Sequence, residues 1–426
     1  MERSDPRYQA YVEILKEELI PAMGCTEPIA LAYAAAKARE VLGVLPDSVQ
    51  LQVSGSIIKN VKSVIVPNTG HLKGMEAAVA AGIIAGSAEK ELEVISEVSE
   101  EKKSAIRDYL QTVPITIEHT EQGHVFDIVV TERCGQDYAR VRIADYHTNI
   151  CRIERNGTVL YEVPLLDETV QEDARADRSL LNMQDIWDFA ETADLRDVAD
   201  LLERQIRYNN AIAEEGLLGD YGANIGRVLL TTYGNDVSNR AKAKAAAGSD
   251  ARMNGCELPV IINSGSGNQG ITCSVPLIEY AKELHSGKEK LYRALIISNL
   301  VAIHEKTGIG TLSAYCGAVS AGAGAGAGIV YLCGDGYQAA IHTVVNALAI
   351  VSGIVCDGAK ASCAAKIASS VDAALLGYNM YKCNQEFKGG DGIVMKDIET
   401  TIKGIGRLGK DGMRQTNEEI IRLMMS

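Results

Sequence analysis

Several common catalytic signatures are missing from this 426-residue sequence. It contains no GxSxG, no HExxH and no phosphate-loop GKS or GKT, and His304-Glu305-Lys306 lacks the second histidine of a zinc protease. The ten cysteines include no CxxC pair and no compact zinc spacing. A metal site made from these cysteines must therefore gather thiols from distant parts of the chain.

Positive charge is also scarce, because 42 Lys and Arg stand against 56 Asp and Glu, for a net charge of −14. Nucleic acids and anionic membranes attract clustered Lys and Arg, so neither is expected as a partner. Residues 1–19 lack an apolar signal core, and the apolar stretch 339–355 carries polar residues and predicts a buried helix. We therefore expect a cytoplasmic protein, whose reducing surroundings keep cysteines as thiols.

The periodicity predicts an α+β fold: an N-terminal α/β segment with a mixed or antiparallel sheet, followed by a mainly helical catalytic domain. Strand-like alternation runs from 49 to about 165, an acidic stretch at 167–179 predicts a hinge, and helical patterns follow. The predicted domains are a helix pair carrying Cys25 and packed on the helical domain, an α+β domain and the helical domain itself, at 1–45, 46–175 and 176–426.

The first motif, PAMGCTEP at 21–28, predicts the start of a helix. Thr26 is a good N-cap, and Glu27 and Pro28 suit the first turn. Cys25 then lies just before a helix N-terminus, where the helix dipole favours a thiolate that could bind a metal or act as a nucleophile. A buried loop cysteine is the alternative.

The second motif lies at 258–284, where the strand-like LPVIIN leads into Gly265-x-Gly267-x-x-Gly270 and a helix. This pattern matches a dinucleotide-binding loop, but the next strand-like run, 294–299, ends at Asn299 rather than at an acid. Exposed N–H groups before a helix also suit a carboxylate or phosphate. A plain strand-to-helix turn is the alternative.

The third motif is the Ala-Gly alternation at 321–328, between Cys316 and Cys333. Its glycines recur every four residues on each face, which lets helices approach closely. The apolar flanks argue against a linker, so we predict a tightly buried helix, although each Gly costs about 1 kcal/mol relative to Ala. Further on, Cys356 and Cys363 are seven residues apart, on one face if Gly358 does not break the helix.

Four motifs, GCTEP, SGSGNQG, YCGAVSAGAGAGAG and CDGAKASC, occur in this order, and with them the chain resembles the L-cysteine desulfidase family, which is related to the alpha part of iron–sulfur L-serine dehydratases. The resemblance implies a 4Fe-4S enzyme without pyridoxal phosphate that converts L-cysteine and water to sulfide, pyruvate and ammonia. It implies three cluster ligands, Cys25, Cys316 and Cys356, with one iron open. Cys363 could replace Cys25. The remaining cysteines are expected to be structural: Cys134, Cys151, Cys256, Cys273, Cys333 and Cys383.

The expected partner is a small amino acid, whose carboxylate the loop would hold through Ser264, Ser266, Gly267, Asn268 and Gln269. The catalytic base is unassigned; Lys360 is a candidate through its proximity to Cys356, and a surface lysine is the alternative. A homo-oligomer is compatible with the sequence. The alternative functions are an L-serine dehydratase, a non-catalytic iron–sulfur sensor and a dinucleotide-dependent oxidoreductase using the three glycines of the second motif.

Overall fold

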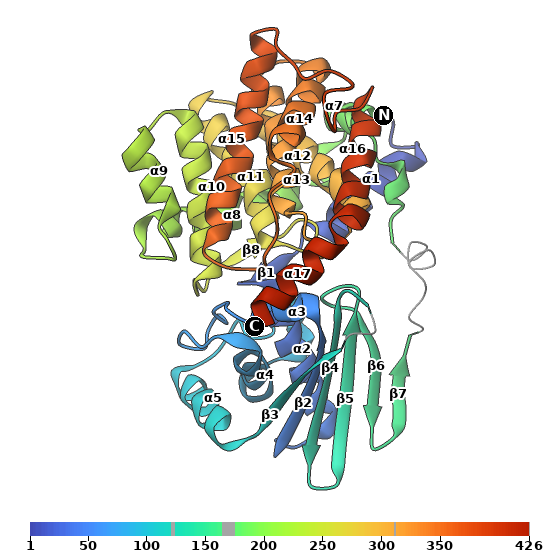
Figure 1. The fold of residues 1–426 in the computed structure, drawn as a ribbon, viewed down its shortest axis with the longest axis vertical. Helices are drawn as coiled ribbons and strands as arrows, with labels where there is room; N and C mark the ends of the chain where they lie inside the picture. The colour runs from blue at the N-terminus through green and yellow to red at the C-terminus, as the bar shows by residue number, and fades with distance from the viewer. Residues whose placement is uncertain (121–123, 164–174, 311, 426) are drawn as a thin grey trace.

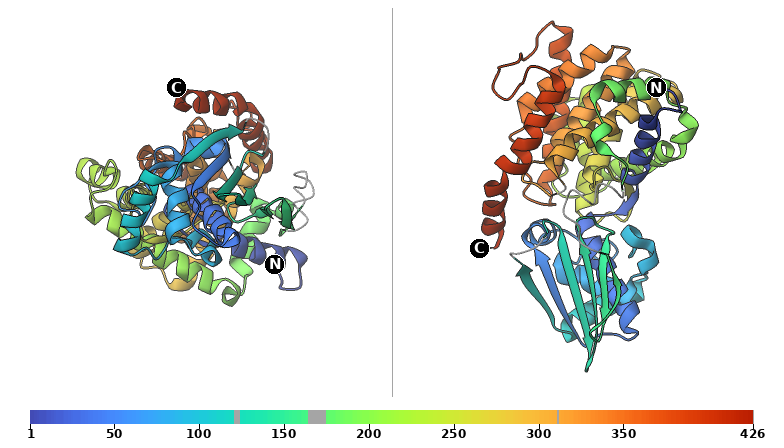
Figure 2. Two further views of the ribbon diagram at one scale, coloured as in Figure 1. Left: turned by 90° about the horizontal axis from the view of Figure 1, so that it is seen from below. Right: turned by 90° about the vertical axis from the view of Figure 1, so that its right-hand side faces the viewer.

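The computed structural model describes residues 1–120, 124–163, 175–310 and 312–425, and it confirms the α+β class. Two lobes are stacked along the long axis (Figure 1, Figure 2). The sheet lobe comprises the elements from the N-cap of α2, Cys25, to the end of β7 at Glu162, and the helical lobe comprises α1 and the elements from residue 175 to η5. Most of the predicted hinge at 167–179 lies outside the described residues. None of the described helices is long and apolar enough to cross a membrane.

The sheet lobe contains a six-stranded mixed sheet of order β3-β2-β4-β5-β6-β7, in which β2 and β3 are parallel and the other neighbours antiparallel. Side chains alternate between a buried and a more exposed face, as in β2, which follows from the period of two of an extended chain. The strands are β2 (Ser48–Ser54), β3 (Ile115–Thr120), β4 (Asp127–Cys134), β5 (Asp137–Ala144), β6 (Ile150–Arg155) and β7 (Thr158–Glu162).

Alanine-rich helices cover this sheet. α2 packs against β4, β5 and α4, and a Cβ added at Gly82 of α4 would lie 2.2 Å from the Ala32 carbonyl oxygen of α2. Two backbones therefore touch at a position that only glycine fits. The helices of the lobe are α2 (Thr26–Leu42), α3 (Gly55–Val61), α4 (Gly74–Ala85), η1 (Ala88–Glu93) and α5 (Glu100–Thr112).

The first two helices do not pack as the expected pair. α1 (Pro6–Glu18) contacts α12 of the helical lobe, whereas α2 lies on the sheet. α2 has buried residues on all sides, so it needs a partner on each face and the sheet supplies one. Between them β1 (Pro21–Met23) pairs antiparallel with β8 (Pro259–Ile261), which ties the chain crossing between the lobes to the helical lobe.

In the helical lobe, α13 (Gly317–Cys333) is surrounded by α11, α12, α14 and α15 (Figure 1). The predicted buried helix over the Ala-Gly alternation is confirmed. The other elements are η3 (Arg178–Leu180), α7 (Met183–Thr192), η4 (Leu195–Asp197), α8 (Ala199–Leu218), α9 (Ile225–Tyr233), α10 (Val237–Met253), α11 (Gly267–Glu283), α12 (Lys288–Ile309), α14 (Tyr337–Val351), α15 (Ser362–Lys382), α16 (Ile398–Arg407) and η5 (Leu408–Gly412).

Alternate glycines of α13 face different neighbours. Added Cβ atoms would lie 2.8 Å from Ser370 of α15 at Gly322 and 2.4 Å from the Ser298 carbonyl oxygen of α12 at Gly324. Gly326 and Gly328 repeat this on the next turn, against Ala374 and the Ala294 carbonyl oxygen. The alternation thus removes side chains on two faces at once.

Two expected strands are helical instead. Residues 55–61 form α3, and the strand-like run 294–299 lies within α12. Both runs are fully buried, and a short apolar run gives no periodicity that separates a buried strand from a buried helix. The last helix, α17 (Arg414–Met425), leaves the helical lobe and ends beside α3 (Figure 1).

Candidate functional site

Two of the predicted thiols are held side by side by backbone pairing. Tyr315 and Val355 form an isolated antiparallel bridge. The Cys316 N–H donates to the Ile354 carbonyl oxygen at 3.2 Å, and the Cys356 N–H donates to that of Ala314 at 2.6 Å. Segments 40 residues apart in the sequence therefore bring Cys316, the N-cap of α13, next to Cys356.

Cys363 joins this pair. Gly358, at φ +95°, separates Cys356 from α15, so the continuous helix considered from the sequence is not formed. Burial, together with the neighbouring thiols of Cys356 and Cys363, raises the pKa of Cys316 to about 12. The three sulfur atoms are therefore close enough to influence one another electrostatically.

Cys25 is linked to this group through Arg252, because the charges of Cys25 and Cys363 both act to raise the pKa of that arginine, although burial lowers it overall. Cys25 is itself the N-cap of α2, one residue before the predicted Thr26, and its thiol donates to Glu27 Oε2 at 3.0 Å. Burial and the Glu27 carboxylate raise the pKa of Cys25 well above its usual value. The expected dipole-stabilised thiolate is therefore wrong for this state, because desolvation and a neighbouring negative charge outweigh the helix dipole.

Four helices begin around these thiols, and none has a side-chain N-cap hydrogen bond: α2, α11, α13 and α15. The Thr26 hydroxyl of α2 donates to the Gly265 carbonyl oxygen at 3.0 Å, just before α11. A Cβ added at Gly317 of α13 would lie 2.6 Å from the Gln269 side chain of α11. Uncapped N–H groups and aligned helix dipoles make this junction attractive to negative charge.

Lysine side chains add positive charge to the positive ends of these helices. Lys59 of α3 is 2% exposed and donates to the Cys356 carbonyl oxygen at 3.3 Å. Burial lowers the pKa of Lys306 to about 8, against the opposing influence of the nearby Cys356 and Cys316. Lys366 forms an ion pair with Asp357 beside Cys356. Positive charge is thus concentrated here in a protein whose net charge is negative.

The loop between β8 and α11 is a tight turn next to the thiols. Ser264 and Gly265 have positive φ angles of 48° and 74°, and Ser266 is the N-cap. The carbonyl oxygens of the Asn268 and Gln269 side chains are buried and have no hydrogen-bond partner among the described residues. The structure therefore places the predicted loop residues at the junction, with Asn268 and Gln269 offering free acceptors.

The sequence reading missed an acidic and basic pair at the same place. Glu27 accepts from Asn60 Nδ2 at 3.1 Å and lies 3.9 Å from His147 Nε2. Burial opposes its charge, but His147 and the Cys25 thiol lower its pKa to about 2. Glu27 was available in the GCTEP motif, whereas His147, on the connection from β5 to β6, is in no motif and no local signal marks it.

The chemistry of the donor set decides which metal group the junction could hold. No three Cys, His, Asp or Glu side chains within the described ranges form a site for one metal ion. Two buried thiols, Cys25 and Cys316, and two partly buried thiols, Cys356 and Cys363, lie among helix N-termini and cations. This environment suits the thiolate charge and burial that iron–sulfur clusters need.

The remaining predicted positions are Lys360 and the thiols expected to be structural. Lys360 is partly buried at the edge of the site, 3.9 Å from Asp357 Oδ2, and its carbonyl oxygen accepts from the Cys363 N–H at 3.0 Å. Cys151, Cys256 and Cys273 are buried, as expected of structural thiols. Cys333 is exposed rather than in the core, because it ends α13 just before the turn at Gly334, and Cys383 is also exposed.

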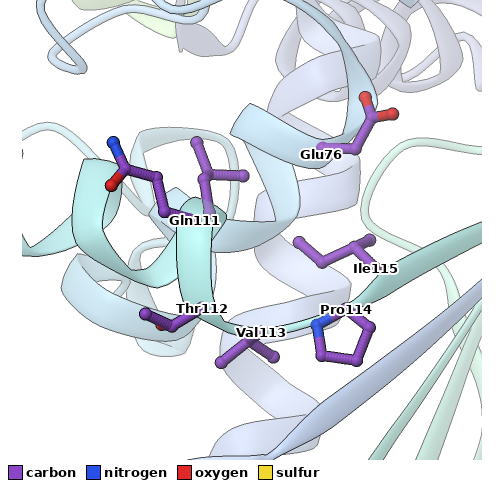
Figure 3. A pocket seen from close by; sticks show the side chains of 7 residues that line it. Glu76, Gln111, Thr112, Val113, Pro114 and Ile115 are labelled. Carbon is purple, nitrogen blue, oxygen red and sulfur yellow. The ribbon is translucent and has the colours of Figure 1, made fainter.

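Two pockets of about 410 and 510 Å³ also lie away from the cysteines. The first is lined by residues of α4, α5 and the start of β3, with Glu76 as its charged residue (Figure 3). The second lies next to it and includes Lys62, His119 and the end of α17. Neither offers a thiol, so neither replaces the junction as the candidate site.

The dinucleotide alternative does not fit this geometry. β8 pairs only with β1, antiparallel, in a two-stranded sheet within the described chain, and no parallel βαβ unit follows it. The fold and site instead define a two-lobed α+β protein that gathers thiols where helix N-termini meet. A family model for the serine dehydratase alpha chain matches residues 89–422, and the chain belongs to this family.

Relatives match along the full length. The chain is 61% identical to a UPF0597 protein of Desulfitobacterium hafniense, covering all of this chain and 99% of the relative. A UPF0597 protein of Lachnoclostridium phytofermentans is 52% identical, covering 98% and 100%, and one of Treponema denticola is 47% identical, covering 98% of each. The predicted relation to the serine dehydratase alpha chain is therefore confirmed.

Proposed function

We propose that this protein is a 4Fe-4S-dependent lyase that removes the β-substituent of a small amino acid, and that L-cysteine is its substrate. The observation that carries the proposal is the meeting of buried thiols, uncapped helix N-termini and buried cations at one junction. Membership of the serine dehydratase alpha chain family supports the reaction class.

Cys25, Cys316 and Cys356 are the proposed cluster ligands. The backbone segments of Cys316 and Cys356 are paired. The charges of Cys316, Cys356 and Glu27 act to raise the pKa of Lys59, although burial lowers it overall. Lys59 therefore lies near all three residues. The N-terminus of α2, with Cys25, is thereby brought to the same junction. Cys363 is the rival third ligand because it lies beside the pair.

The proposed reaction is a β-elimination. When bound, a cluster with one open iron supplies a Lewis acid for the departing group. A base takes the Cα proton, the Cβ–S bond breaks with its electron pair going to sulfide, and the resulting enamine tautomerises and takes up water to give pyruvate and ammonia. The loop at 264–269 is proposed to hold the substrate carboxylate next to the thiols.

L-Serine is the second candidate substrate because the matching family is named for serine dehydratase. The site would then release water where L-cysteine releases sulfide, and the other bonds broken are the same. A cluster-binding sensor is the alternative from another class, and it predicts iron without turnover.

The test is product release from protein purified and iron-reconstituted without oxygen, offered L-cysteine and L-serine in parallel. We expect equal amounts of sulfide and pyruvate from L-cysteine and loss of activity in air. Pyruvate from L-serine alone would retain the mechanism and change the substrate. A bound cluster with no product from either amino acid would contradict an enzymatic function and favour the sensor.

A further inference from the structure

One arginine at the junction is buried without a direct ion pair. Arg252, in the last turn of α10, is 2% exposed. It forms no ion pair within 4.0 Å in the part of the chain that the structure describes, and its Nε has no hydrogen-bond partner there. A buried charge is costly unless it is paired, so such an arginine indicates a partner outside the polypeptide.

The guanidinium lies at the start of α11. A Cβ added at Gly267, the first residue of that helix, would lie 2.2 Å from Arg252 Nε and 2.7 Å from its Cζ. Glycine at this position therefore lets the guanidinium approach the uncapped first turn. The loop 264–269 contains no positively charged residue. The backbone N–H groups of the loop carry only partial charge, so Arg252 supplies the full positive charge.

The first turn of α11 also carries two acceptor atoms without a hydrogen-bond partner among the described residues. Gln269 is 5% exposed, its Oε1 is unpartnered among the described residues, and Asn268 Oδ1 is likewise unpartnered. A planar guanidinium binds a carboxylate through two parallel N–H bonds, and amide oxygens accept from an ammonium group. A guanidinium at the first residue of α11 and two acceptors on the next two residues match the two charged ends of an α-amino acid.

We propose that Arg252 binds the α-carboxylate of the substrate at the N-terminus of α11, with Asn268 and Gln269 accepting from its ammonium group. This inference rests on the proposed function and adds the residue that selects a carboxylate. Glu27 and the thiols of Cys25 and Cys363 are the groups whose charge Arg252 faces. The competing role for Arg252 is to balance thiolate charge rather than to bind a ligand.

The experiment titrates the anaerobic, iron-reconstituted protein with pyruvate and with pyruvamide, its uncharged analogue, by calorimetry. Loss of a charge-assisted hydrogen-bond pair costs about tenfold to a hundredfold in affinity. Arg252→Met should therefore weaken pyruvate binding by about that factor and leave pyruvamide binding unchanged. Arg252→Lys, which keeps the charge but loses the fork, should be intermediate and guards against misfolding of the Met variant.

Arg204→Met is the matched control, because Arg204 on the neighbouring helix α8 also has an unpartnered Nε and lies outside the site. It should bind pyruvate as the unaltered protein does. Equal loss of pyruvate and pyruvamide affinity, or no loss, in Arg252→Met would overturn the proposal. Loss of iron with pyruvate binding intact would also overturn it and assign Arg252 to the thiols. Absence of turnover would defeat the proposed function alone, since the titration needs none.

Discussion

The two lobes fill their interiors in different ways. The sheet lobe places β-branched side chains such as Val53 and Ile128 between strands and covering helices, with one backbone contact at Gly82, whereas residues 320–328 of α13 contribute little beyond Cβ atoms. Side chains can adjust to a changed neighbour, but touching backbones cannot. This stretch is therefore the less tolerant framework, and the helical lobe supplies three of the four thiols: Cys316 and Cys363 at helix starts and Cys356 in the loop between α14 and α15.

The site needs both lobes. Cys316, Cys356 and Cys363 come from the helical lobe, while Cys25, Glu27, Lys59 and His147 come from the sheet lobe. The two lobes are in backbone contact at Gly358, because a Cβ there would lie 2.1 Å from the Lys59 carbonyl oxygen. The thiol-bearing loop thus rests directly on α3.

The largest expected effect distinguishes which lobe supplies the third ligand of the proposed cluster. Cys25→Ala removes the sheet lobe's thiol and Cys363→Ala the helical lobe's. We expect Cys25→Ala to lose most of its iron and all activity after anaerobic reconstitution, and Cys363→Ala to keep both. Iron and sulfide per chain, together with the visible absorbance of the cluster, measure the outcome. The reverse pattern would assign the site entirely to the helical lobe.

The next effect tests the rigidity of the helical lobe. Gly324→Ala would place a Cβ 2.4 Å from the Ser298 carbonyl oxygen, which forces α13 and α12 apart. Overpacking of this kind costs about 3 kcal/mol in the free energy of unfolding, measured by urea denaturation. Gly336→Ala, with open space around it and an ordinary φ, should change that free energy by about 0.5 kcal/mol or less. Similar losses in both variants would refute the backbone-contact argument.

The sequence predicted those features that local patterns encode. The Ala-Gly alternation indicated close helix packing, and the motifs identified the thiols and the loop. The α3 segment was mistaken for a strand because it is short and buried on all sides. No local pattern marks Arg252 or His147, because their neighbours at the junction are far away in the sequence and only folding brings them together. The Cys25 thiolate was wrongly expected because burial outweighs the helix dipole, and burial is a tertiary property.

A smaller effect concerns Asp250, which connects α10 to the start of α9 in the helical lobe. Asp250 of α10 accepts from the Ile225 N–H at 2.7 Å at the start of α9, and burial raises its pKa from 3.8 to about 6. Below pH 3.8 both folded and unfolded states hold the proton. Between pH 3.8 and 6 the unfolded state has released the proton while the folded state still holds it. The free energy of unfolding therefore falls as the pH rises through this range.

Asp250→Asn removes that titration. Relative to the unaltered protein, its free energy of unfolding should therefore improve by about 2 to 3 kcal/mol between pH 4 and pH 7. Urea denaturation of both proteins at a series of pH values measures the difference, in which the other carboxylates cancel. A difference that is independent of pH would show that Asp250 ionises normally in the folded protein.

The smallest effect concerns α17, the helix that links the lobes from outside. α17 has no buried residue, yet Asn417 Oδ1 accepts from the buried Lys59 Nζ at 2.7 Å, and the Lys62 ammonium donates to the Met424 carbonyl oxygen. Asn417→Ala removes one acceptor of a buried ammonium. Water can replace it at this partly exposed helix, so we expect only about 1 kcal/mol of destabilisation.

That loss should be local. A helix held by few buried contacts opens before the rest of the fold, so amide hydrogen exchange in Asn417→Ala should accelerate over 414–425 and stay unchanged in α13. Glu419→Ala is the control, because among the described residues Glu419 pairs only with Arg422 of the same helix and both are exposed. Equal acceleration in the two variants would show that α17 is held by its apolar contact with Gly55 through Ile421 rather than by Lys59. Acceleration confined to Asn417→Ala would show that the site's buried lysine anchors the helix crossing between the lobes.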